Sequence, residues 1–132
     1  MSLSAGRRVL AVVPDLFFAT KLAATARVCG VELELVPAPR AVARMEEAPP
    51  ALTIIDLHAP DAMALVARLK VAAPGIPVVG FYSHVEHRVR LDALAAGADA
   101  ALPRSQFVVK LAGLLSRGLE VLTEPAPGTA TP

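Results

Sequence analysis

The sequence has one cysteine and almost no excess of charge. The single cysteine, Cys29, has no partner for an intramolecular disulfide, so folding does not depend on oxidation and we expect a cytoplasmic protein. The 13 basic and 12 acidic side chains leave a net charge of +1. Nucleic acids and acidic membranes attract a concentrated basic face, so we expect neither as a partner.

Long apolar runs and glycine-rich loops are also missing. No apolar run approaches the ~18–20 residues of a membrane span, and residues 1–8 lack the apolar stretch of a secretory signal. Residues 14–18, after the first apolar run, contain no glycine, which argues against a dinucleotide or flavin site. No nucleophile elbow surrounds Ser83 and His84, so hydrolase chemistry is not indicated and we expect no enzyme.

The 132 residues are enough for one domain with a real core. We expect this domain over residues 7–122, after an N-terminal tail of residues 1–6. Residues 123–132 are rich in proline and predict a disordered tail or linker.

Short apolar runs alternate five times with longer stretches of helical periodicity, which predicts an α/β domain with a parallel sheet. The expected strands are residues 9–13, 31–36, 52–55, 76–81 and 100–102, and the expected helices are residues 16–29, 41–47, 62–71, 84–96 and 106–122.

The charge content of the strands predicts their order. The first, third and fourth carry no charge in their centres, as in strands covered on both faces. The second alternates Val-Glu-Leu-Glu-Leu and the fifth is short, which favours the two edges. We therefore expect a doubly wound, flavodoxin-like sheet of order 2-1-3-4-5, a three-layer sandwich with helices on both faces.

Apolar stripes mark the buried sides of the helices. Cys29 continues the stripe of Phe18, Leu22 and Ala26, which predicts a small core residue. The last stretch is expected as one helix to residue 122. The apolar residues outside its stripe, which we expect to remain available to a partner, are Val109, Leu114 and Val121.

Two carboxylates, Asp15 and Asp56, follow the first and third strands. In a doubly wound sheet of this order, ligands bind beyond the carboxyl ends of these strands. Two carboxylates and a backbone carbonyl suit a hard cation such as Mg²⁺. The alternative is that each carboxylate only caps the helix that follows it.

Four segments, in order and at matching spacing, resemble one known pattern. They are residues 9–15, 54–62 (Ile-Ile-Asp-Leu-His-Ala-Pro-Asp-Ala), 76–79 and 93–103 (Ala-Leu-Ala-Ala-Gly-Ala-Asp-Ala-Ala-Leu-Pro). Together they resemble the response-regulator receiver domain of bacterial two-component signalling, over about residues 7–119. The last segment, similar to Ala-Leu-x-Ala-Gly-Ala-x-x-Tyr-Leu-x-Lys-Pro, is the most specific.

The resemblance implies roles for three residues. Asp56 matches the aspartate that accepts a phosphoryl group. Asp15 matches an acid that binds Mg²⁺ together with it, and His58 matches the residue whose backbone carbonyl completes the metal site. An anionic nucleophile needs the metal to offset its repulsion from the phosphoryl group.

The departures from the pattern concern the same site. Pro14 stands where the family has another acid, so we expect weak Mg²⁺ binding. Tyr82 takes the position of the switch hydroxyl, or Ser83 after a shift of one residue. Arg104 replaces the lysine that contacts the phosphate. Because Ser105 replaces the following proline, we expect a trans peptide bond and a displaced Arg104.

These departures favour a degenerate receiver that acts through protein–protein contacts, with weak or absent phosphorylation of Asp56. The alternative is a working, Mg²⁺-dependent phosphoacceptor. The partner would be a histidine kinase, a downstream signalling protein or a second copy, bound through the fourth helix, fifth strand and fifth helix; an ordinary solvated face is the other interpretation. The charged residues expected on that face are Arg88, Arg90, Asp92, Asp99 and Lys110.

The sequence also contains weaker indications of two other ligands, cobalamin and a histidine-bound metal ion. Asp56-Leu57-His58 also matches the Asp-x-His of cobalamin-binding domains, but there it is usually followed by glycine at the position of Asp61 and comes after the first strand. Cobalamin is therefore a remote alternative. His84 and His87, near Glu86, lack a convincing third metal ligand and read best as surface histidines.

Overall fold

The computed structural model describes residues 7–83 and 87–122. The expected tails and two of the residues weighed as metal ligands, His84 and Glu86, lie outside this range. The elements are β1 (Arg8–Val12), α1 (Leu16–Val28), β2 (Glu32–Leu35), α2 (Ala38–Glu47), β3 (Leu52–Asp56), α3 (Ala62–Ala72), β4 (Val78–Tyr82), α4 (His87–Ala96), β5 (Ala100–Pro103), α5 (Arg104–Arg117) and the 3₁₀ turn η1 (Gly118–Leu122).

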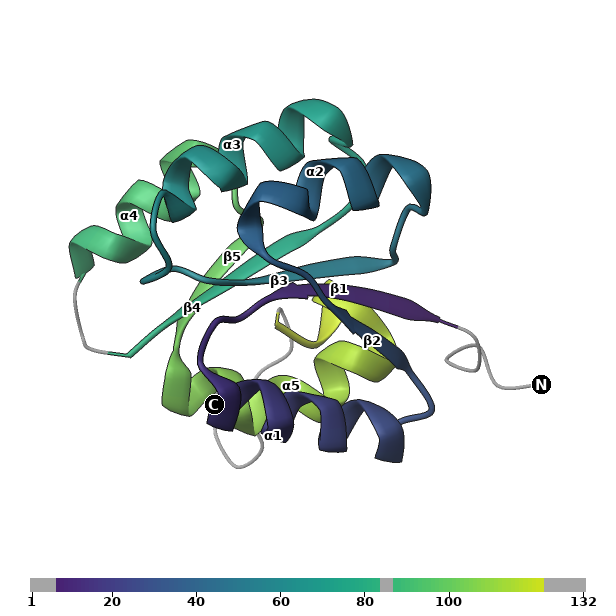
Figure 1. The fold of residues 1–132 in the computed structure, drawn as a ribbon. Helices are drawn as coiled ribbons and strands as arrows, with labels where there is room; N and C mark the ends of the chain where they lie inside the picture. The colour runs from purple at the N-terminus through teal and green to yellow at the C-terminus, as the bar shows by residue number, and fades with distance from the viewer. Residues whose placement is uncertain (1–6, 84–86, 123–132) are drawn as a thin grey trace.

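The five strands form one parallel sheet in the order β2-β1-β3-β4-β5, which confirms the predicted fold and strand order. Helices α1 and α5 cover one face, and α2, α3 and α4 cover the other (Figure 1). The edge position of β2 fits its alternating sequence, because a strand paired on one side keeps partly wetted side chains.

Two cores lie on the two faces of the sheet. Alternate residues of β4 serve different cores, as the pleat of a strand requires. Val79 and Phe81 pack on the side of α1 and α5, whereas Val78 and Tyr82 pack on the side of α2, α3 and α4. All five residues of β3 and of β4 are buried, so the centre of the sheet is a rigid support for the loops at its carboxyl end.

Helix α2 begins at Ala38, three residues earlier than predicted. Pro37 is its N-cap and Pro39 lies in its first turn. Proline is tolerated there, because the first amide groups of a helix have no partner within the helix. The prolines therefore belong to the helix start rather than to a loop before it.

The predicted final helix is interrupted. Helix α5 ends at Arg117, where Gly118 adopts a φ of 78°, and residues 118–122 form the 3₁₀ turn. Leu114, predicted to lie outside the apolar stripe, is fully buried, so that prediction is wrong. Val109 is 81% exposed, as expected, and Val121 packs against the core.

Cys29 lies at the margin of the core rather than inside it. It is the C-cap of α1, is partly buried and packs against the cluster on the α1 and α5 side. Gly30 follows it with a φ of 71°, a left-handed conformation that glycine adopts without strain. Within residues 7–83 and 87–122, no helix is long and apolar enough to cross a membrane.

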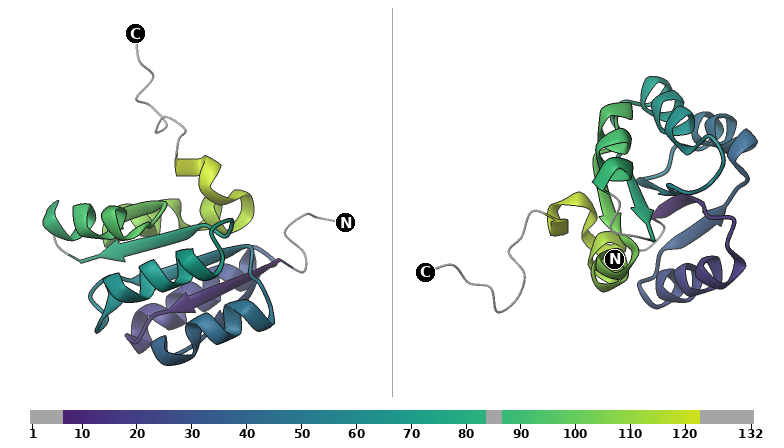
Figure 2. Two further views of the ribbon diagram at one scale, coloured as in Figure 1. Left: turned by 90° about the horizontal axis from the view of Figure 1, so that it is seen from above. Right: turned by 90° about the vertical axis from the view of Figure 1, so that its left-hand side faces the viewer.

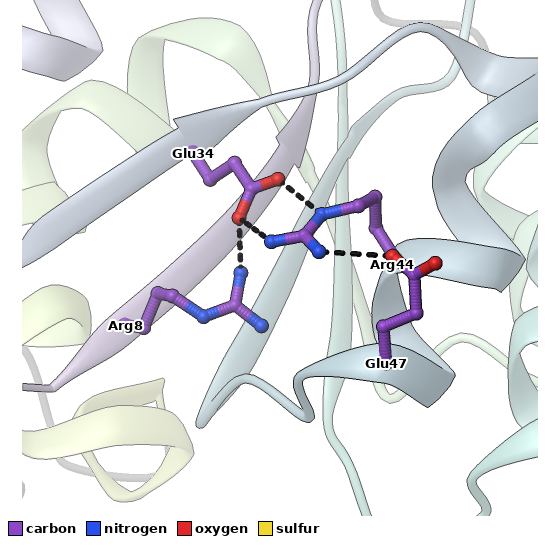
Figure 3. A network of polar contacts seen from close by, with 4 residues as sticks. All are labelled: Arg8, Glu34, Arg44 and Glu47. Carbon is purple, nitrogen blue, oxygen red and sulfur yellow. Dashed lines mark hydrogen bonds and ion pairs between the residues drawn. The ribbon is translucent and has the colours of Figure 1, made fainter.

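A charge network ties the edge strand β2 to the sheet and to α2 (Figure 3). Glu34 accepts hydrogen bonds from Arg8 at 2.5 Å and from Nε and Nη2 of Arg44 at 2.6 and 2.9 Å. Arg44 also donates to Glu47 at 2.9 Å. The hydrogen bonds from Arg44, with the positive charges of Arg44 and Arg8, lower the pKa of Glu34 below its ordinary value of 4.5.

We expect Glu34→Gln to lower the thermal midpoint at neutral pH by roughly 2–4 °C. A carboxyl with a lowered pKa in the folded state stabilises the fold above its unfolded pKa. The difference from the wild type should therefore shrink as the pH falls below 4.5 and through the lowered pKa. Thermal melts between neutral and acid pH measure this. Glu32→Gln, at an exposed position of the same strand without an ion pair to any described residue, is the control. An equal loss at all pH values would contradict the prediction.

Candidate functional site

The topology brings Asp15 and Asp56 to the same end of the sheet. Strands β1 and β3 are neighbours, with Val12 opposite Ile55. Asp56 is the next residue and ends β3, and Asp15 follows three residues after Val12. Both carboxylates therefore lie at the carboxyl ends of the two central strands, as the strand order predicts.

Asp15 is the N-cap of α1. Its Oδ1 accepts hydrogen bonds from the backbone N–H groups of Phe17 and Phe18 at 3.0 and 3.3 Å. Its Oδ2 lies 3.5 Å from Nη1 of Arg104, the first residue of α5. Both oxygens of Asp15 thus have protein partners, and one of them caps the helix that follows.

Asp56 is in a different environment. Its side chain is buried, with the residue only 7% exposed, and Oδ1 accepts a hydrogen bond from the N–H of His58 at 2.9 Å. It does not cap α3, whose N-cap is Asp61 in the left-handed conformation (φ 57°). The loop from β3 to α3 therefore holds the Asp56 carboxylate by one oxygen against the next turn of the backbone.

Arg104 lies over an aromatic cluster. Its guanidinium carbon is 4.5 Å from the ring centroid of Phe18 and 5.4 Å from that of Phe81, distances at which a cation is attracted to the face of a ring. Phe81 also contacts Phe107 at 5.0 Å between centroids, so three of the four phenylalanines form one cluster. The peptide bond to Ser105 is trans, as expected.

This cluster is the part of the site that the sequence did not predict. Phe18 and Phe107 come from the two helices on one face, α1 and α5, and Phe81 comes from β4 between them. Their rings hold the guanidinium near Asp15, and Nε of Arg104 is buried without an acceptor among the described residues. The only signal in the sequence was the apolar stripe that contains Phe18.

The two hydroxyl candidates lie in contrasting places. Tyr82, the last residue of β4, is buried in the core on the side of α2, α3 and α4. Ser83 follows the strand and is exposed. Tyr82 fills a core position because alternate residues of β4 point to that face.

The residues at this site fit Mg²⁺ poorly. Pro14 supplies no carboxylate, and both oxygens of Asp15 are engaged by backbone amides and by a cation. Beside the site lies a hollow bordered mainly by Pro14, Pro39, Ala59 and Pro60, with Asp61 and Arg68 as its charged residues. Among residues 7–83 and 87–122, no three His, Cys, Asp or Glu side chains form a group that suits a metal ion.

Several charged residues on the face of α4, β5 and α5 form contacts within the protein. Asp99 accepts from Nζ of Lys70 at 2.9 Å and from the N–H of Val78 at 2.8 Å, so its carboxylate joins α3 to the start of β4. Arg88 pairs with Asp92 within α4 at 3.4 Å. Arg90 borders a groove on this face whose other walls include Leu94, Leu102, Gln106, Leu119 and Leu122. Lys110 lies on α5 and is partly exposed.

The comparisons with known proteins concern the fold. Neither a protein-family model nor a curated protein matches the sequence. The receiver domain of NtrX from Brucella abortus superposes with a TM-score of 0.74 at 23% identity, over 85% of this chain and 98% of that chain. A CheY-like response regulator receiver domain protein from Methanospirillum hungatei JF-1 gives a TM-score of 0.71 at 21% identity, over 90% of this chain and 98% of that chain.

A longer structure of NtrX from Brucella abortus, in complex with ADP, gives a TM-score of 0.76 at 22% identity. It matches 93% of this chain, and the chain spans 27% of that protein. The strand order, the parallel sheet and these superpositions agree, and the chain has the fold of response-regulator receiver domains.

Proposed function

We propose that this chain is a receiver-like signal-transduction domain that acts through protein–protein contacts, with weak or absent phosphorylation of Asp56 and no enzymatic activity of its own. The observation that carries the proposal is the engagement of Asp15. One oxygen caps α1 and the other pairs with Arg104, so a fixed cation of the protein neutralises the carboxylate that the family resemblance assigns to Mg²⁺.

The position of Arg104 supports the same conclusion. A guanidinium that rests on Phe18 and Phe81 and pairs with Asp15 is held on three sides. To reach a phosphoryl group on Asp56, it would have to give up these contacts. The charges of Arg104 and Asp15 therefore offset each other within the protein.

The signalling partner is proposed to bind the face of α4, β5 and α5. Its groove combines apolar side chains with Arg90 and Gln106, a mixture typical of surfaces that bind other proteins reversibly. A histidine kinase or a downstream signalling protein would use this face.

The alternative, a working phosphoacceptor, rests on Asp56. Its carboxylate ends β3 at the carboxyl edge of the sheet, and Oδ1 accepts a hydrogen bond from the N–H of His58. The second oxygen is thus the one that a phosphodonor would meet.

A phosphodonor experiment decides between the two. The protein is incubated with Mg²⁺ and acetyl phosphate, or with beryllofluoride, and followed by intact mass and by amide NMR. We expect no change in mass and no shifts around Asp56. A change in the wild type that Asp56→Asn removes, and that Asp61→Asn at a neighbouring exposed acid leaves intact, would overturn the proposal and establish the phosphoacceptor.

A further inference from the structure

An apolar groove runs between α2 and α3 on the outside of the molecule. The two helices lie side by side over the same face of the sheet (Figure 2). Val71 is 83% exposed there, a large apolar side chain in contact with water. The residues that line the groove are Val42, Glu46, Ala67, Arg68, Val71 and Ala72.

The only charged residues of the groove are one acid and one base, and they lie toward opposite ends. Glu46 is one residue from the carboxyl end of α2. Arg68 also borders the neighbouring hollow with Ala38 and Pro39, the first residues of α2.

Neither charge has a partner in the part of the chain that the structure describes. Among residues 7–83 and 87–122, the ion pairs and side-chain hydrogen bonds include neither Glu46 nor Arg68. By contrast, Arg44 and Glu47, on the same helix as Glu46, are paired. The groove therefore has an apolar floor with an unpaired negative charge toward one end and an unpaired positive charge toward the other.

We propose that this groove binds a second copy of the chain in a two-fold symmetric dimer. A two-fold axis across the groove reverses its direction, so that the acidic end of one copy faces the basic end of the other. Arg68 then pairs with Glu46 of the partner subunit, and the same pair forms again on the other side of the axis. Val42 and Val71 pack between the two ion pairs, and the exposed surface of Val71 is removed from water.

Charge complementarity favours a second copy over another protein. A groove with one unpaired acid and one unpaired base at its two ends is complementary to itself, and the pairing satisfies both charges at once. The groove shares no lining residue with the groove on the face of α4, β5 and α5. The dimer goes beyond the proposed function and stands or falls independently of phosphorylation.

Charge reversal tests the dimer. Sedimentation velocity over a range of concentrations should show reversible dimers of the wild type. Arg68→Glu places two carboxylates opposite each other and Glu46→Arg places two guanidinium groups opposite each other, so each variant should dimerise on the order of tenfold more weakly or not at all. An equimolar mixture of the two variants should form a heterodimer, and the double variant, which keeps the net charge of +1, should recover the homodimer.

Two further variants complete the test. Arg27→Glu makes the same change of charge on α1, on the opposite face of the sheet, and should leave the dimer intact. Val71→Asp, at an exposed position, should give a monomer with an unchanged circular dichroism spectrum. A monomeric wild type at all concentrations, an Arg68→Glu variant that dimerises like the wild type, or a mixture that stays monomeric would each overturn the proposal.

Discussion

Gly80→Ala is expected to destabilise the domain by about 3 kcal/mol, although it adds a single methyl group. Gly80 lies in the centre of β4, opposite Ile55 of β3 and Ala101 of β5. A Cβ at this position would lie 2.6 Å from both Cγ and Cδ2 of Leu57. Carbon atoms in favourable contact are ~3.5–4.0 Å apart, so the added atom and Leu57 cannot both keep their places.

Leu57 has little freedom to move away. It is only 5% exposed, and its N–H donates to the carbonyl of Phe81 at 2.9 Å, which fixes its backbone beside β4. Because Leu57 lies between Asp56 and His58, any displacement also moves the loop that holds the Asp56 carboxylate. We therefore expect Gly80→Ala to shift the amide NMR signals of this loop as well as to lower stability.

Chemical denaturation measures the loss of stability. Further variants test whether the clash with Leu57 causes it. Leu57→Ala alone should cost about 3 kcal/mol through the cavity that it leaves. In the double variant Gly80→Ala/Leu57→Ala, the new methyl group occupies space left by the leucine side chain. The total loss of stability should therefore be close to that of Leu57→Ala alone. Gly75→Ala, where an added Cβ meets no atom within 4 Å, is the matched control and should change stability by less than about 0.5 kcal/mol. Additive losses in the double variant would contradict the steric explanation.

The order of the strands was predictable because the charged residues within a strand indicate whether it is central or lies at an edge. Strands β3 and β4 carry no charge before their last residues and are buried along their whole length, whereas β2 alternates and lies at an edge. This local signal favours the central and edge positions, and the right-handed crossover rule then places helices on both faces of the sheet. The positions of Asp15 and Asp56 at one end of the sheet then follow from the topology alone.

The end of α5 and the contacts inside the site were not predictable, because they depend on residues that are distant in the sequence. Residues 108–122 keep helical spacing past Gly118, and only the left-handed φ at that glycine ends α5. The insertion of Leu57 over Gly80 joins residues 23 positions apart, and the aromatic support of Arg104 joins α1, β4 and α5. Such contacts arise from side-chain packing between distant segments, so the sequence predicted where the carboxylates are but not which of their oxygens are engaged.

The engagement of Asp15 leads to the prediction with the largest functional effect. Pro14→Asp combined with Arg104→Lys is expected to raise the affinity for Mg²⁺ by about tenfold or more. The first change adds a carboxylate directly before Asp15, at an exposed position where the receiver family has an acid. The second replaces the planar guanidinium, which stacks on Phe18 and pairs with Oδ2 of Asp15, by a flexible ammonium group that does not reproduce both contacts. Asp15 is then released to serve as a ligand.

Titration with MgCl₂, followed by calorimetry and amide NMR, measures the gain, and the shifts should centre on residues around Asp15 and Asp56. In the same background, Asp15→Asn should abolish the gain, because it removes the carboxylate that the substitutions release. Pro60→Asp in place of Pro14→Asp adds the same charge at another exposed proline beside the same hollow, so it separates a specific ligand from a general increase in negative charge. An equal gain with Pro60→Asp, or Mg²⁺ binding by the wild type as tight as by the double variant, would show that the Arg104–Asp15 pair is not what limits metal binding.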